Sequence, residues 1–354
     1  MSMGMQAQTP LTLEEIYTGA FRAKGMDELQ AMKLSNQYTV LNTDRSSRSQ
    51  QIDLYDYATL KKISTLLDTK NHQVLSEGID SYTFSSDEKQ ILIANNSNPI
   101  YRHSFTADYY VYEVATKSLR KVLEQVQEPI FSPDGTKIAY AKSNNLYVYD
   151  IASGQSTALT TDGEKNAIIN GITDWVYEEE FAFVRAFDWS KDSQKIAFIR
   201  FDEREVPEFS MDVYGKNLYP NQERFKYPKA GEKNALVSLH IYDVKTGAKK
   251  EVNLSQYNDF YIARMRWTND ANVLCAQVLN RHQNNLDLLF IDGTTAVAQV
   301  VLNEKDKAYV DVTDNLTFLK DNSFIWTSEK DGWNHIYLYL SLIHISEPTR
   351  PIIR

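Results

Sequence analysis

Three consecutive glutamates, Glu178 to Glu180, are the residues with the clearest chemical potential in the sequence. They lie in the segment G-I-T-D-W-V-Y-E-E-E-F-A-F, in which aromatic residues precede and follow them. Adjacent carboxylates repel one another, and burying them costs hydration unless a cation offsets the loss. The run therefore indicates either an acidic helix face in solvent or a receptor for an amine. On a helix, at most two of the three acids can converge on one ligand.

The composition favours a large, strand-rich protein. A chain of 354 residues is longer than one ordinary hydrophobic core supports. A single domain of this length requires a repeat or a closed β architecture. The sequence contains 22 tyrosines and is 12% aromatic, which is typical of strands and argues against disorder. Its net charge of -9 provides no general basic face for phosphates, so we expect no nucleic-acid partner.

The single cysteine and the N-terminus say little about the cellular compartment. Cys275 lies in the apolar run V-L-C-A-Q-V, so we expect a buried, inert thiol rather than a nucleophile. No apolar stretch reaches the length of about 18 residues that a membrane span requires. Residues 1–8 fit either the remnant of a signal peptide or a disordered leader, and we expect the protein to be exported.

Local patterns predict one short helix followed by many strands. Thr12 and Glu15 fit a capping box, which predicts a helix extending to about Phe21. From Gln37 onwards the helical period disappears, and short strands alternate with polar turns.

The turns repeat along the chain. In each repeat an aromatic residue ends one strand, a polar turn with Asp follows, and an apolar strand begins shortly afterwards. The aromatic anchors are Phe84, Phe131, Trp189, Trp267 and Phe318. Their spacings of 47, 58, 78 and 51 residues are close to the period of a four-stranded propeller blade. We therefore predict an all-β propeller with about six blades, counting a degenerate first blade at 38–57.

The longest spacing contains an insertion at 202–234. It holds three prolines and little alternation, so we expect a long loop leaving the edge of a blade. Long ordered loops on a repeat scaffold more often serve a function than not.

Four motifs together carry a family resemblance. They are R-H-S-F-T-A-D-Y at 102–109, D-W-V-Y-E-E-E-F at 174–181, E-V-P at 205–207 and Y-P-K-A-G at 227–231. In this order and spacing, the region 9–339 resembles the propeller domain of dipeptidyl-peptidase IV, in the prolyl oligopeptidase clan of serine peptidases. The resemblance implies an eight-bladed propeller followed by an α/β-hydrolase domain, of which about six blades lie in this chain.

The resemblance also implies a binding site for the substrate N-terminus. By motif match, Glu179 and Glu180 bind the free α-ammonium, and Glu178 is structural. Arg102 matches the arginine that contacts a substrate carbonyl, with a surface salt bridge as the alternative. Phe324 falls where the family places an aromatic wall, although a core strand residue explains it equally well. The resemblance implies no cofactor and no metal.

The sequence lacks the catalytic arrangement of the clan. No G-x-S-x-G nucleophile elbow occurs, so we expect no catalytic residue in this chain and a hydrolase domain elsewhere in the parent protein. Residues 340–354 do not fit the family pattern and resemble translated sequencing-adapter sequence, so we expect a non-native tail.

The functional prediction is therefore the substrate-gating propeller of a serine exopeptidase. The parent enzyme is expected to release X-Pro or X-Ala dipeptides from peptides with a free N-terminus, and to form a homodimer. The alternative from another class is a non-catalytic propeller that serves as a protein-binding platform. A glycosidase is disfavoured, because its two carboxyls must flank a bond and adjacent glutamates do not.

Overall fold

The computed structural model describes residues 11–23, 25, 28–44 and 46–340, and these residues form a nearly all-β protein with two short α-helices. The chain divides into two compact units, residues 1–71 and residues 72–354. The proposed leader at 1–8 and residues 341–354 of the proposed tail lie outside the described residues. No helix among the described residues is long and apolar enough to span a bilayer.

The first unit contains one helix and one antiparallel sheet in the strand order β1-β2-β3-β4. Thr12 and Glu15 form the predicted capping box, but the helix ends at Gly19, which adopts the left-handed conformation with φ of 82°. The prediction that it reaches Phe21 is therefore wrong. The elements of this unit are α1 (Leu13–Thr18), β1 (Leu29–Ala31), β2 (Gln37–Asp44), β3 (Ser49–Asp56), β4 (Lys62–Asp68) and the 3-10 turn η1 (Thr69–Asn71).

The second unit begins with a seven-stranded antiparallel sheet that contains two blade-like halves. Its 14-residue strand β8 pairs with β7 near one end and with β9 near the other, so one strand serves both halves. The elements are η2 (Gln73–Leu75), β5 (Ser81–Phe84), β6 (Gln90–Pro99), β7 (Phe105–Glu113), β8 (Ser118–Phe131), β9 (Lys137–Lys142), β10 (Asn145–Asp150) and β11 (Gln155–Ala158).

Three further blade-like sheets of this unit provide most of its core. The large apolar cluster joins the sheet of β14 and β17 to that of β19 to β22 and to β24 and β25. Their elements are β12 (Ile168–Asn170), α2 (Trp175–Glu180), β13 (Phe187–Trp189), β14 (Lys195–Asp202), β17 (Leu236–Asp243), β18 (Lys249–Glu251), β19 (Phe260–Trp267), β20 (Val273–Asn280), β21 (Asn285–Asp292), β22 (Ala298–Lys305), β23 (Thr317–Phe318), β24 (Phe324–Ser328) and β25 (His335–Tyr339).

The blade-like sheets agree with the predicted repeat. The predicted anchors Trp189 and Trp267 are 3% and 1% exposed and pack into the core as expected, whereas Phe84, Phe131 and Phe318 are half-buried. Counting the two halves of the large sheet separately, the described residues contain six blade-like sheets, which confirms a propeller-type all-β fold. Cys275 is 1% exposed in β20, and burial raises the pKa of its thiol, so it is inert as predicted.

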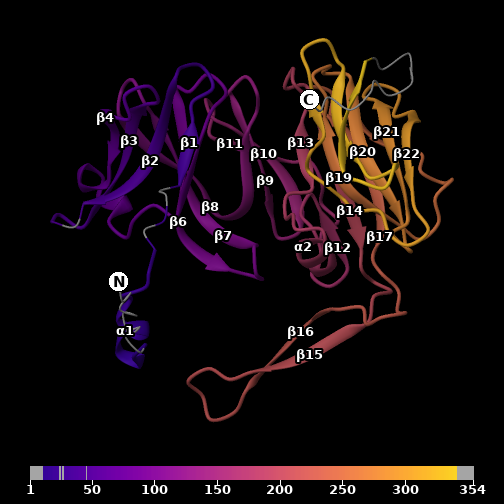
Figure 1. Cartoon of the computed structure of the whole chain (residues 1–354), viewed down its shortest axis with the longest axis horizontal. Helices are drawn as coiled ribbons and strands as arrows, with labels where there is room; N and C mark the ends of the chain where they lie inside the picture. Colours follow the sequence, from indigo (N-terminus) through magenta and orange to yellow (C-terminus); the bar gives the residue numbers. More distant parts are fainter. Residues whose placement is uncertain (1–10, 24, 26–27, 45, 341–354) are drawn as a thin grey trace, which may run out of the picture. The chain divides into compact units, whose positions relative to one another are not determined.

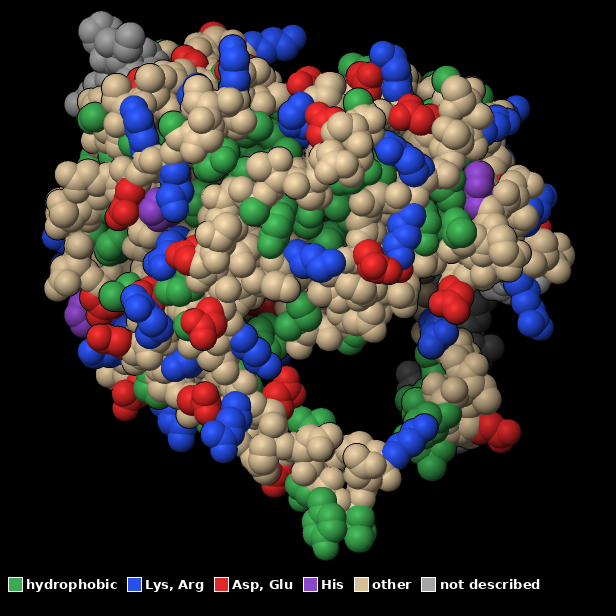
Figure 2. Space-filling model, turned by 180° about the vertical axis from the view of Figure 1, so that it is seen from behind, with side chains coloured by type: hydrophobic (Ala, Val, Ile, Leu, Met, Phe, Trp, Pro, Cys, Tyr) green, Lys and Arg blue, Asp and Glu red, His purple; other side chains and the backbone are tan. Residues whose placement is uncertain are grey.

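The insertion is a β-hairpin and not an irregular loop. Strands β15 (Glu208–Val213) and β16 (Asn221–Lys226) pair with each other alone, from Glu208 opposite Lys226 to Val213 opposite Asn221. Figure 1 shows this hairpin extending away from the sheet of β14 and β17. Hydrophobic side chains gather at its far end in Figure 2, where Leu218 and Tyr219 are 87% and 79% exposed.

Candidate functional site

Helix α2 carries the three glutamates and is held in place by backbone hydrogen bonds on both sides. The N–H of Thr173 donates to the carbonyl of Val184, and the N–H of Ala186 donates to that of Gly171. The side chain of Asp174 caps the helix by accepting the N–H of Tyr177 at 3.0 Å. Six residues are too few to form a stable isolated helix, so these tertiary contacts must fix it.

Tyr177 anchors α2 to the core. Its side chain is 2% exposed and its ring packs against four aromatic rings, with centroid distances of 4.9 Å to Phe201 and 5.1 Å to Phe181. Its hydroxyl oxygen accepts the N–H of Ile262 in β19 at 3.0 Å. Burial raises the pKa of this hydroxyl well above its ordinary value, so it remains protonated.

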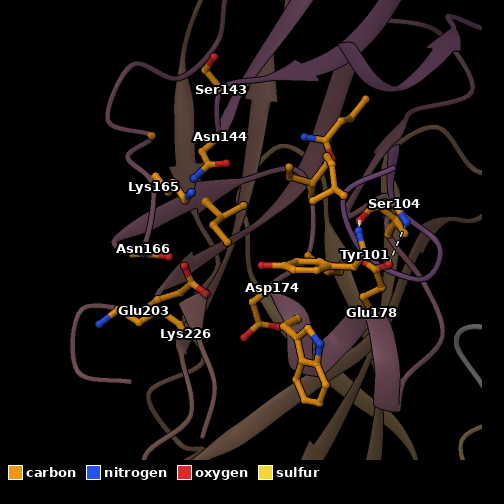
Figure 3. A pocket seen from close by; sticks show the side chains of 18 of the residues that line it. Tyr101, Ser104, Ser143, Asn144, Lys165, Asn166, Asp174, Glu178, Glu203 and Lys226 are labelled. Carbon is orange, nitrogen blue, oxygen red and sulfur yellow. Dashed lines mark hydrogen bonds between the residues drawn. The ribbon is translucent and has the colours of Figure 1, made fainter. Parts of the chain in front are cut away.

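Glu178 joins α2 to the segment that follows β6. Its carboxylate oxygen Oε1 accepts the backbone N–H groups of His103 at 2.7 Å and Ser104 at 2.8 Å, as Figure 3 shows for Ser104. The side chain is 1% exposed. Glu178 therefore fixes the chain immediately after Arg102 and is itself almost fully buried.

Glu179 and Glu180 are the more accessible acids of the run. The Arg102 Nε atom lies 2.9 Å from Glu179 Oε2, and the side chain of Glu179 is 17% exposed. Glu180 is exposed and has no hydrogen bond or ion pair with any described residue. One acid is thus held by a guanidinium while its neighbour remains available to a ligand.

The four motifs meet around α2 although up to 129 residues separate their ends in the sequence. The rings of Trp175 and Tyr227 lie 4.5 Å apart, which connects D-W-V-Y-E-E-E-F to Y-P-K-A-G. The N–H of Tyr227 donates to the carbonyl of Pro207 at 3.0 Å, which adds E-V-P. With Glu178 bound to His103, all four motifs form one structural unit.

The family model described as the dipeptidyl peptidase IV N-terminal region matches residues 85–345. The chain belongs to this family.

Similarity to known proteins supports the same assignment. A crystal structure of Porphyromonas gingivalis dipeptidyl peptidase 4 matches with a TM-score of 0.90 and 36% identity, over 97% of this chain and 49% of that one. Dipeptidyl aminopeptidase B of Saccharomyces cerevisiae is 30% identical over 301 residues, which cover 77% of this chain and 37% of the yeast protein. Human prolyl endopeptidase FAP is 30% identical over 284 residues, covering 77% and 36% of the two chains. This chain therefore spans about a third to half the length of these relatives.

Among the predicted site residues of this dipeptidyl peptidase IV region, the structure joins Arg102 with Glu179, and Glu180 follows directly in α2. Phe324 lies elsewhere, in the apolar core. It is 2% exposed and stacks on Tyr339 with ring centroids 4.9 Å apart. The structure therefore corrects the proposed aromatic wall in favour of the alternative, a core strand residue.

Replacing Glu178 tests its role in the dipeptidyl peptidase IV region. Glu178→Ala leaves two N–H groups without their acceptor, and each unsatisfied buried group costs about 1–3 kcal/mol. We expect a lower free energy of unfolding, measured by urea denaturation, and a smaller loss for Glu178→Gln, which keeps an acceptor oxygen. Glu180→Ala on the exposed side of the same helix should change stability by less than about 0.5 kcal/mol. Equal stability of Glu178→Ala and wild type would contradict this role.

Proposed function

We propose that this region recognises the free N-terminus of peptide substrates for a serine-type dipeptidyl peptidase. In the full-length protein, the ammonium group of the first residue would bind between Glu179 and Glu180, and a dipeptide ending in Pro or Ala would be released. The observation that carries the proposal is the arrangement of these acids on a short helix fixed from two sides. Charge-assisted hydrogen bonds to a rigid carboxylate pair favour an ammonium group over a neutral end.

Arg102 has a definite part in this proposal. Its guanidinium is 71% exposed beyond the contact with Glu179, so donors remain available to a substrate carbonyl. Because the ion pair also orients Glu179, recognition of the amine and of the following carbonyl would be coupled. Fixing both ends of the first residue places the scissile bond at a set distance from the amine.

The proposal includes two partners implied by the resemblance. The first is a hydrolase domain that supplies the nucleophile, and the second is another copy of the protein. The exposed apolar end of the β15–β16 hairpin supports a protein contact, because soluble monomers rarely expose such groups together. A non-catalytic platform is not favoured, since the matched relatives are named as peptidases.

The substrate requirement provides the test. The full-length protein should hydrolyse Gly-Pro-p-nitroanilide, and N-acetylation of that substrate should lower kcat/KM by about 100-fold or more, because two charge-assisted bonds of about 1.5–3 kcal/mol are lost. Release of nitroaniline measures both rates. Ala-Pro-p-nitroanilide is a control that keeps the amine, and it should remain a substrate. Equal hydrolysis of acetylated and free substrates would overturn the proposal.

A further inference from the structure

An acidic cavity lies beside the candidate site and is not explained by the proposed function. It has a volume of about 470 Å³ and opens between the segment after β6, the 163–166 segment, the start of α2 and the end of β14. The side chains of Tyr101, Asp174 and Glu203 face its interior in Figure 3. Glu179, Glu180 and Arg102 do not line it.

Glu203 is a buried carboxylate without a partner. It is 6% exposed and lines the cavity, yet its side chain forms no hydrogen bond or ion pair with any described residue. Two lysines, Lys165 and Lys226, also line the cavity, and the charge of Lys226 acts on Glu203, but the Lys226 Nζ atom donates to the carbonyl of Val206 at 2.8 Å. A buried acid in this state has much to gain from a cation that enters the cavity.

A second buried polar group in the cavity also lacks a partner. Gln127 is 9% exposed, and its carboxamide forms no hydrogen bond within the described part of the chain. Neither side chain has a polar atom that is fully enclosed without a partner, so the polar atoms of Glu203 and Gln127 reach the open space of the cavity and are available to a ligand there. The size of the cavity exceeds the roughly 30 Å³ share of one water molecule several times over.

The lining indicates the chemical class of the occupant. Asp174 and Glu203 bring carboxylates to the cavity, and the rings of Tyr101 and Trp175 contribute aromatic surface. Carboxylates combined with aromatic rings favour an organic cation, which gains ion pairing and cation–π contact together. A bare metal ion fits less well, because the described residues contain no group of three or more His, Cys, Asp or Glu placed to hold one.

We propose that this cavity binds an alkylammonium or guanidinium group, with Glu203 as its principal anionic contact and Gln127 as a neutral acceptor. The cation could be a basic side chain of a peptide or a free small amine, since both present the same chemistry. The site is separate from the pair Glu179 and Glu180, so it does not depend on the function proposed above.

The charged groups around Glu203 determine how binding varies with pH. Asp174 at the start of α2 and Asp202 in β14 raise its pKa, Lys226 in β16 lowers it, and burial is the largest influence, giving a pKa of about 8. Glu203 is therefore protonated at neutral pH. Because a cation must displace this proton, the affinity should rise as the pH increases from about 6.5 to about 8.5.

Calorimetry on the chain with two probes tests the proposal. The probes are n-butylammonium, a free amine, and N-acetyl-argininamide, a basic side chain without a free α-ammonium. The uncharged analogues 1-butanol and N-acetyl-citrullinamide are the ligand controls. We expect the charged probe to bind and its neutral analogue not to bind. Binding of only the arginine compound identifies a peptide side chain as the source of the cation, and binding of only butylammonium identifies a free amine.

Substitutions locate the binding site. Glu203→Gln should lower the affinity for the charged probe by about 10-fold or more, because one charge-assisted contact is lost. It should leave the melting temperature near that of wild type, because the acid it replaces is already uncharged at neutral pH. Glu180→Gln, which alters the proposed amine site, should leave binding of N-acetyl-argininamide unchanged, because that probe has no free α-ammonium. Unchanged affinity of Glu203→Gln, or loss of N-acetyl-argininamide binding in Glu180→Gln, would overturn the inference, as would equal binding of the neutral analogues.

Discussion

Tyr177→Ala is expected to lower the free energy of unfolding by about 3–5 kcal/mol, the usual cost of removing a large buried aromatic side chain. The ring packs against Phe181, Phe183, Phe201 and Tyr261, so its loss leaves a cavity lined by four aromatic residues. The backbone N–H of Ile262 also loses its acceptor. Urea denaturation followed by fluorescence measures the change.

Two further variants separate the causes of this loss. Tyr177→Phe keeps the ring and removes only the acceptor for the Ile262 N–H, so it should cost about 1–3 kcal/mol. Tyr214→Ala is the surface control, because that side chain is 71% exposed, and it should change stability by less than about 0.5 kcal/mol. If Tyr177→Ala were as stable as Tyr214→Ala, the anchoring role of Tyr177 would be wrong.

In the full-length protein, Glu179→Gln and Glu180→Gln should each lower kcat/KM for Gly-Pro-p-nitroanilide by about 10- to 100-fold, the cost of one charge-assisted contact. Glutamine keeps the size and the acceptor oxygen, so the change isolates the charge. The Glu179 variant should be the more damaging, because it also leaves the Arg102 guanidinium without its anion. Initial rates across a range of substrate concentrations separate KM from kcat.

The matched control is Glu205→Gln. Glu205 pairs with Lys233 on an exposed part of the same unit, so its loss should leave kcat/KM within about twofold of wild type. The N-acetylated substrate is a second control, since it has no ammonium group and its slow hydrolysis should not respond to Glu180→Gln. Full activity of the double variant Glu179→Gln/Glu180→Gln would show that this helix does not recognise the substrate amine.

The propeller-type fold could be predicted because its turns repeat a local chemistry. At Phe131 and Trp189 an aromatic residue, a polar turn and an apolar strand follow in order. Each such segment predicts one blade independently of the other segments. The hairpin was missed although Glu208–Val213 alternates polar and apolar residues, a pattern typical of a strand. Its partner Asn221–Lys226 does not alternate, because both strands are largely exposed and no core selects one face.

Only those residues of the candidate site that lie within one sequence motif could be predicted. Glu178 and Glu179 lie in one segment, and the motif match predicted a structural role for Glu178, with which its two backbone contacts agree, and a binding role for Glu179, which stays a prediction. Glu203 could not be predicted, because in F-D-E-R-E-V it stands among charged residues and resembles a solvated acid. Only the folding of β14 against the 163–166 segment and α2 buries it. Phe324 shows the opposite error, since spacing alone cannot distinguish a core side chain from a ligand contact.

The anchoring of α2 has a consequence for how this protein can diverge. The acids of the helix depend on His103, which lies 75 residues earlier in the chain than Glu178, and on Ile262, which lies 85 residues later than Tyr177. A substitution in either remote segment can tilt the carboxylates while every acidic residue stays the same. Related enzymes could therefore acquire different substrate preferences through changes that a comparison of their acidic motifs alone would not detect.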